Sequence, residues 1–183
     1  MIYPFVKSAG MFQCPSNPRN GGTDYNVGLP NSTEPTGLTV SYAAARYDGA
    51  GLNGPHGAFL DDPVTGDSIP VTLAGLQTQS STLEIVEDTS TFSELSVTKL
   101  GCFEQCDDSG AYDCLFAGPT ARANCLFCDG HVKALRPLQT VDAGKGGAGD
   151  LNLWTTDNSQ FASAGDRARA MQILMASTQY YRP

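Results

Sequence analysis

Residues 142–157 combine two carboxylates with a glycine-rich backbone, a pattern that suits a metal ion. The segment reads DAGKGGAGDLNLWTTD, with four glycines between Asp142 and Asp150 and the only tryptophan of the chain, Trp154, just beyond. Glycine lets the backbone fold back and turn its carbonyls inward, and Ca²⁺ takes about six to eight oxygen ligands. Composition by itself favours a flexible loop with two solvated acids, so the calcium hypothesis depends on the rest of the chain.

Asp129 and His131 form a second candidate site. A histidine beside a turn is usually a structural hydrogen-bonding residue. As the alternative, His131 or an acid such as Asp129 or Asp150 acts as general base in a calcium-dependent hydrolase of an ester- or lactone-like small molecule, with the ion polarising the carbonyl. The chain has two histidines, and the other is His56. A three-histidine metal site within one chain is therefore excluded.

The six cysteines leave three readings open. They are Cys14, Cys102, Cys106, Cys114, Cys125 and Cys128. An even number with five close together fits a disulfide set, which would require an oxidising compartment. Free thiols are the second reading. The third is a zinc site built from the 102/106 and 125/128 pairs.

The bulk composition excludes several classes of partner. The chain has 183 residues, a net charge of −8 and 16% charged residues. This length fits one domain spanning residues 1–183. With no basic patch to neutralise phosphates, we expect neither nucleic acid nor an anionic membrane surface as a partner. No apolar run reaches the length of a membrane span, and residues 1–4 show no signal-peptide pattern. We therefore expect a soluble chain without membrane insertion or an export signal.

Periodicity predicts an α+β fold, in which an antiparallel β-sheet with long loops carries a C-terminal helix. Strands are predicted over 39–47 and 81–89, and a hairpin over 123–135 around Asp129-Gly130, the dipeptide that type I′ turns favour. Val40, Tyr42 and Ala44 alternate along the first strand. The second carries Leu83, Ile85 and, after a change of face, Val86.

The predicted helix spans 163–177, with Ser163 and Asp166 as a capping pair. Its expected apolar face comprises Ala168, Met171, Leu174 and Met175. Trp154 is expected to cap the core behind the glycine-rich loop.

Four short motifs occur in a fixed order along the chain. They are YPFVK from Tyr3, FQCPS from Phe12, SYA from Ser41 and NCLFCDGHV from Asn124. This series resembles the DUF1559, or H-X9-DG, prepilin-like proteins, which are relatives of the pseudopilins. The resemblance covers residues 3 to about 135. It implies a pseudopilin-like globular domain, located in the periplasm or outside the cell in full-length relatives. It also implies other pseudopilin or secretion-machinery subunits as partners.

A narrower resemblance concerns the glycine-rich segment. The segment ends in an acid, an aliphatic residue, two further residues and a tryptophan, from Asp150 to Trp154. This ending is similar to that of the C-terminal calcium loop of the major pseudopilin of type II secretion. The resemblance implies calcium as the ion and Asp142 and Asp150 as side-chain ligands. It also implies backbone carbonyls near Gln139, Lys145 and Gly147 as further ligands.

This sequence departs from the family pattern at two points. The hallmark histidine, ten residues before the hairpin aspartate, is replaced by Pro119. The N-terminal apolar helix, with which pseudopilins enter the membrane and pack into filaments, has no counterpart in the sequence. We therefore expect the sheet face that this helix would cover to be covered by another part of the chain or by a second copy in a homodimer, or to remain an apolar patch.

Overall fold

The structure is a computed structural model of the chain. Its description covers residues 9–16, 22–23, 38–39, 41–47, 56–61, 68–88, 94–97, 115, 120–141 and 151–180. The predicted calcium ligands Asp142, Lys145, Gly147 and Asp150 lie outside the described residues. So do three of the cysteines, at positions 102, 106 and 114.

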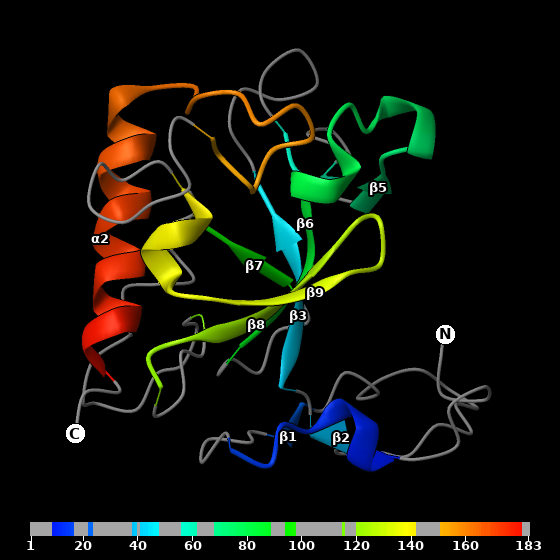
Figure 1. The fold of residues 1–183 in the computed structure, drawn as a ribbon, viewed down its shortest axis with the longest axis vertical. Helices are drawn as coiled ribbons and strands as arrows, with labels where there is room; N and C mark the ends of the chain where they lie inside the picture. The colour runs from blue at the N-terminus through cyan, green and yellow to red at the C-terminus, as the bar shows by residue number, and fades with distance from the viewer. Residues whose placement is uncertain are drawn as a thin grey trace.

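Four antiparallel strands form the centre of the fold. Their order is β3 (Tyr42–Arg46), β6 (Leu83–Glu87), β8 (Ala123–Phe127) and β9 (Val132–Leu135). Every adjacent pair in this series is antiparallel. Figure 1 shows the C-terminal helix α2 (Ala164–Tyr180) standing beside the sheet. The α+β class, the antiparallel sheet and the helix are thus confirmed.

Beyond β3 the sheet becomes mixed, which periodicity did not predict. Strand β4 (Phe59–Asp61) runs parallel to β3 and pairs antiparallel with β5 (Ser68–Pro70). Strand β7 (Glu94–Ser96) also runs parallel to β3. A separate pair, β1 (Gly22–Thr23) and β2 (Leu38–Thr39), lies away from the main sheet (Figure 1). Alternation reports which face of a strand is buried but does not report its direction relative to a neighbour.

The β8–β9 hairpin is confirmed, but its turn is not of type I′. The Gly130 N–H donates to the Phe127 carbonyl at 2.8 Å, and the Phe127 N–H donates to the His131 carbonyl at 3.0 Å. Gly130 has φ of +89°, whereas Asp129 is not among the described non-glycine residues with positive φ. A type I′ turn needs positive φ at both central residues. The connection therefore has three residues, with glycine in the left-handed position.

The buried face of strand β3 is not the one that carries the alternating residues Tyr42 and Ala44. Ala43, Ala45 and Tyr47 are buried, whereas Tyr42 and Ala44 are partly exposed. The sequence pattern was ambiguous because three consecutive alanines carry no polar–apolar contrast. Small side chains on the inner face let the covering chain approach closely, and Tyr47 fills the space at the end of the strand.

Strand β6 changes face as predicted. The pairing of β6 with β8 shifts register between Leu83 and Ile85. Both Leu83 and Val86 are fully buried as a result. A bulge of this kind lets two residues an odd number apart face the same core.

Helix α2 begins with the predicted cap but buries a different face. Ser163 Oγ accepts the Asp166 N–H at 3.1 Å and donates to the Asp166 carboxylate at 2.9 Å, so the capping pair is confirmed. The buried residues are Ala170, Ile173, Leu174 and Ser177; Ala168 and Met175 are exposed, and Met171 is partly buried. The small side chains at 170 and 177 allow the helix to lie close to the molecule, which a hydrophobicity pattern does not register.

The described 3₁₀-helices are short and lie between strands or beside the core. They are η1 (Ala9–Phe12), η3 (Leu73–Gly75), η4 (Gln79–Ser81) and η6 (Pro137–Thr140). Of these, η6 lies against α2.

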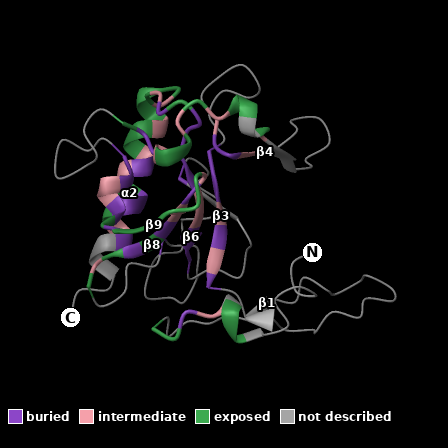
Figure 2. Ribbon diagram, turned by 45° about the vertical axis from the view of Figure 1, so that its right-hand side comes forward, coloured by how far each residue is buried: buried purple, intermediate pink, exposed green. Residues whose placement is uncertain are grey.

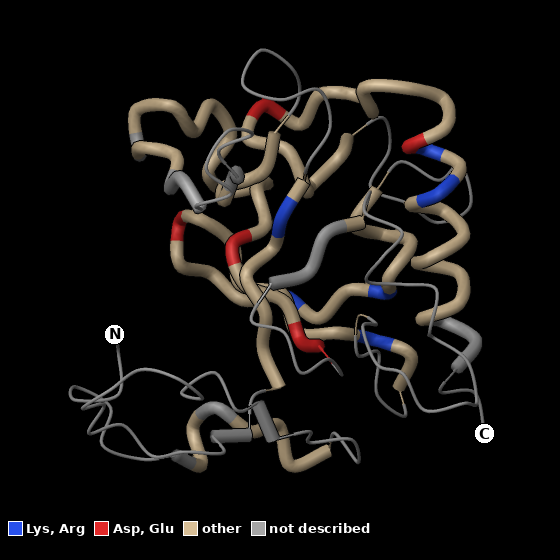
Figure 3. Tube along the Cα trace, turned by 180° about the vertical axis from the view of Figure 1, so that it is seen from behind, with Lys and Arg blue, Asp and Glu red and all other residues tan. Residues whose placement is uncertain are grey.

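The core lies between the sheet, the inner face of α2 and the segment around Trp154. Trp154 is fully buried and is the largest fully buried side chain among the described residues, which confirms that it packs in the core. Figure 2 shows buried residues along β3, β8 and the inner side of α2. Among the described residues, the lysines and arginines are spread over separate elements (Figure 3). No helix in this part of the chain is both long and apolar enough to cross a bilayer.

Candidate functional site

Two hydrogen bonds tie together the two sides of the glycine-rich segment. The Leu153 N–H donates to the Thr140 carbonyl at 2.9 Å. The indole N–H of Trp154 donates to Thr140 Oγ1, also at 2.9 Å. Thr140 and Trp154 are fully buried, and Leu153 is nearly so. The residues that flank 142–150 on its two sides are therefore held together at Thr140.

The residues that follow this point are fastened to three other parts of the molecule. The Leu153 carbonyl accepts the Leu83 N–H at 2.8 Å, at the start of β6. The Thr156 N–H donates to the His56 carbonyl at 2.9 Å. The Asn158 side chain donates to the Ser81 carbonyl at 2.8 Å. Segment 152–158, although irregular, is thus built into the core.

Gln139 is the one predicted calcium ligand that the structure describes. Its side-chain oxygen accepts the Arg136 N–H at 2.8 Å, closing the first turn of η6. That oxygen is therefore already used within the protein, and Gln139 has its backbone carbonyl to offer a cation. The carbonyl role that the pseudopilin resemblance implies for Gln139 stays a prediction. In the part of the chain that is described, no three His, Cys, Asp or Glu side chains are grouped to hold a metal ion.

Asp129 and His131 are hydrogen-bonded to each other at the hairpin. His131 Nδ1 lies 2.6 Å from Asp129 Oδ1, and the His131 backbone N–H donates to the same oxygen at 3.1 Å. These two contacts, the backbone one first, lower the pKa of the Asp129 carboxyl below its ordinary value. The imidazole also stacks on Phe127, with ring centroids 4.3 Å apart and planes inclined by 7°.

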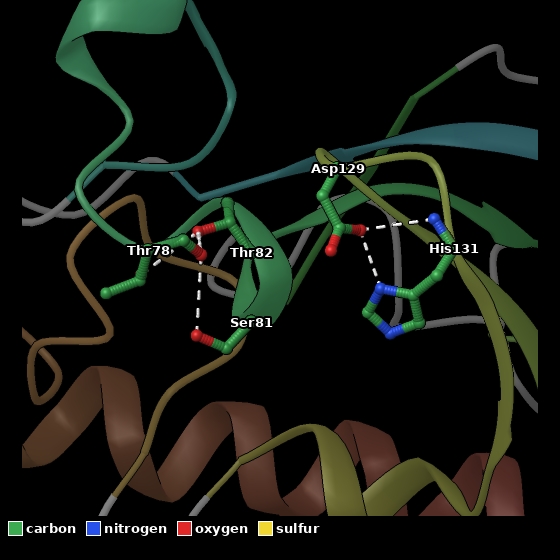
Figure 4. A network of polar contacts seen from close by, with 5 residues as sticks. All are labelled: Thr78, Ser81, Thr82, Asp129 and His131. Carbon is green, nitrogen blue, oxygen red and sulfur yellow. Dashed lines mark hydrogen bonds and ion pairs between the residues drawn. The ribbon is translucent and has the colours of Figure 1, made fainter.

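These contacts leave the second ring nitrogen of His131 available for chemistry. Figure 4 shows Nδ1 of His131 turned toward Asp129 and the second ring nitrogen turned away from it. The His131 side chain is 43% exposed and that of Asp129 is 35% exposed. A carboxylate on one nitrogen fixes the ring and leaves the other nitrogen to accept a proton.

A pocket of about 360 Å³ opens beside this pair, and we call it the β9 pocket. It lies among β8, β9, η4, η6 and the returning chain at 151–153. Its polar lining is Ser80, Ser81, His131, Lys133 and Gln139. Its apolar lining is Phe127, Leu135, Leu151 and Leu153. This volume lies in the range of small-molecule sites, roughly 300–1,000 Å³.

The pocket brings together some predicted residues and adds others. His131 and Gln139, singled out for different reasons, line the same cavity. Ser80, Ser81 and Lys133 were missed by the sequence interpretation. One signal was present: His131, Lys133 and Leu135 alternate along one strand and so face one side of the hairpin. The sequence gives no comparable signal for Ser80 and Ser81 of η4, since only the fold places them beside the pocket.

Two of the cysteines proposed for zinc are free thiols in the structure. Cys125 is buried and Cys128 is partly exposed. Burial, followed by the charge of Glu87, raises the pKa of Cys125 to about 12. Burial, followed by the charges of Glu84 and Asp129, raises the pKa of Cys128 to about 11. Both thiols are therefore protonated at neutral pH in the metal-free chain.

Comparison with known protein families, with curated proteins and with solved structures finds no match for this chain. The function of this chain is therefore inferred from the geometry of the site and from the motif resemblance.

Proposed function

We propose that this chain is a pseudopilin-like domain whose glycine-rich segment is held by one calcium ion. Asp142 and Asp150 supply the carboxylates, and backbone carbonyls near Gln139, Lys145 and Gly147 complete the oxygen shell. In this role the ion stabilises a surface that contacts other pseudopilin or secretion-machinery subunits. The protein then acts in assembly, and the role requires no catalytic residue.

One observation carries this proposal: the closure of the segment by Thr140. Asp142 follows Thr140 by two residues, and Asp150 precedes Leu153 by three. The backbone hydrogen bond between Thr140 and Leu153, with the Trp154 indole bond beside it, fixes the two residues between which the segment runs. Fixing the ends of a loop removes much of the entropy that a cation would otherwise have to overcome. The buried tryptophan supplies this closure at the position where the resemblance expects it.

Titration calorimetry of calcium into the chelator-treated protein tests the proposal. We expect one site per chain, and we expect Asp142→Asn or Asp150→Asn to weaken calcium binding by at least about tenfold, since each removes a charged oxygen ligand. Asp157→Asn is the matched control. It makes the same charge change in the same segment, and its side chain accepts the Ser159 N–H at 2.9 Å, a role that asparagine retains. Equal binding by all three variants would refute the ligand assignment.

The Asp129–His131 pair supports a second candidate function, a calcium-dependent hydrolase of an ester- or lactone-like small molecule. The supporting observation is that His131 lines the β9 pocket with its ring fixed by Asp129 and Phe127. The free ring nitrogen would take a proton from water as the water attacks the carbonyl, and calcium held by Asp142 and Asp150 would polarise that carbonyl.

Ester and lactone substrates, assayed with and without chelator, test this second candidate. Replacing His131 with Gln is expected to lower turnover by about 100-fold or more, because a general base contributes at least that much. Unchanged turnover in that variant would exclude the role of His131. Turnover that survives Asp142→Ala and Asp150→Ala would exclude the calcium-dependent form.

A further inference from the structure

The β9 pocket has a lining that differs in charge from the molecule as a whole. The chain carries a net charge of −8, yet no carboxylate lines this cavity among the described residues. Its lining includes Lys133, an exposed residue that forms no ion pair with any described carboxylate. The neighbouring imidazole of His131 is already bonded to Asp129. Among the described residues, the Lys133 charge therefore has no carboxylate partner.

The apolar part of the lining is partly open to solvent. Leu135 and Leu153 are buried at its base, and Leu151 remains 42% exposed at its rim. An exposed leucine beside buried ones is a surface that gains free energy when an apolar group covers it. Ser81 and Gln139 add polar side chains to the lining, and their oxygens are bonded within the protein to Asn158 and Arg136 respectively.

We propose that the β9 pocket binds a small organic monocarboxylate, with its carboxylate on Lys133 and its apolar body against Leu135, Leu151 and Leu153. Lys133 is solvent-exposed where it lines the pocket, and its ammonium can give a carboxylate a charge-assisted hydrogen bond, which is stronger than one between neutral groups. The cavity volume suits one small molecule. The inference concerns binding alone and stands apart from both the calcium segment and any hydrolysis.

Hexanoate serves as the probe, and hexanamide and acetate as the two comparisons. Each is titrated into the isotopically labelled protein, and backbone amide shifts are followed by NMR. We expect hexanoate to shift the amides of His131, Lys133, Leu135 and Gln139. Hexanamide, which lacks the charge, and acetate, which lacks the apolar body, should each bind at least about tenfold more weakly. These comparisons use the unaltered chain and so do not depend on the folding of any variant.

Lys133→Met removes the charge while keeping a long side chain. We expect it to weaken hexanoate binding at least about tenfold. Arg122→Met is the matched control. Arg122 lies at the base of the same hairpin, bonds the Ala134 carbonyl at 3.0 Å and does not line the pocket, so its removal should change affinity by less than about twofold.

Several results would overturn the assignment. They are equal binding of hexanoate and hexanamide, equal loss in the two variants, shifts confined to residues away from the pocket, or no binding of hexanoate at millimolar concentration. Acetate binding as tightly as hexanoate would refute the contribution of the leucines.

Discussion

Gly57 lies where three stretches of backbone meet. A Cβ atom built at this position would lie 2.8 Å from the Tyr47 nitrogen, 3.0 Å from the Trp154 carbonyl oxygen and 3.3 Å from the Arg46 carbonyl carbon. All three neighbours are backbone atoms, so none can swing aside as a flexible side chain would. The absence of a side chain at Gly57 therefore lets the end of β3 approach the buried tryptophan.

We expect Gly57→Ala to lower the free energy of unfolding by about 1–3 kcal/mol, the usual cost of overpacking. Urea denaturation measures this. Gly165→Ala is the control: its Cβ would meet only Ser163 Oγ, at 3.5 Å, in the first turn of α2. Alanine there should raise stability by about 0.4–1 kcal/mol. A neutral Gly57→Ala would contradict the close backbone approach.

Cys128 is a partly exposed thiol with a raised pKa. With a pKa of about 11, its thiolate fraction at pH 8 is about 200-fold below that of an ordinary cysteine of pKa about 8.5. We therefore expect slow alkylation by iodoacetamide at pH 8 that accelerates as pH rises toward 11. Mass spectrometry of the Cys128 peptide measures the rate, and the same peptide in urea gives the reference. Equal rates in native and unfolded protein would contradict the shift.

At the scale of elements, the sequence predicts which segments form strands and helices better than it predicts which faces they bury. Strand β6, the β8–β9 hairpin and α2 appear where periodicity puts them. Strand β3 and α2 are rotated from their expected faces because alanine and serine, which pack well by being small, carry little hydrophobic signal. The parallel pairing of β3 with β4 and β7 depends on contacts distant in sequence.

The rotation of α2 is tested by a pair of adjacent residues. Leu174 is fully buried and Met175 is 42% exposed. We expect Leu174→Ala to cost about 2–5 kcal/mol of unfolding free energy because it leaves a cavity, and Met175→Ala to cost less than about 0.5 kcal/mol. Chemical denaturation distinguishes them. Equal costs would support the face expected from periodicity instead.

At the scale of the whole molecule, the candidate sites gather around one end of the sheet. The closure by Thr140 and Trp154 lies next to η6, and η6 contributes Gln139 to the β9 pocket. Sequence reasoning named the carboxylates, the hairpin pair and the tryptophan separately. It did not predict that His131 of the hairpin and the flank of the glycine-rich segment line one cavity, because that depends on how β9, η4 and η6 pack.

Thr140→Val tests the closure itself. The substitution keeps the shape of the side chain but leaves the buried Trp154 indole N–H without its acceptor. We expect a loss of about 1–3 kcal/mol in unfolding free energy in the presence of chelator, together with weaker calcium binding. Ser163→Ala, which removes the α2 cap, is the control. It should lower stability by about 1 kcal/mol without changing calcium affinity.

The central claim is that the glycine-rich segment binds calcium in the folded chain, and the most direct test is the melting temperature with calcium and with chelator. Saturation at about 100 times the dissociation constant adds about 2.7 kcal/mol to stability, or roughly 5–10 °C for a chain of this size. We predict a rise of that order with calcium and its loss in the chain carrying both Asp142→Asn and Asp150→Asn. No difference between calcium and chelator, or an equal rise in the doubly substituted chain, would contradict the claim.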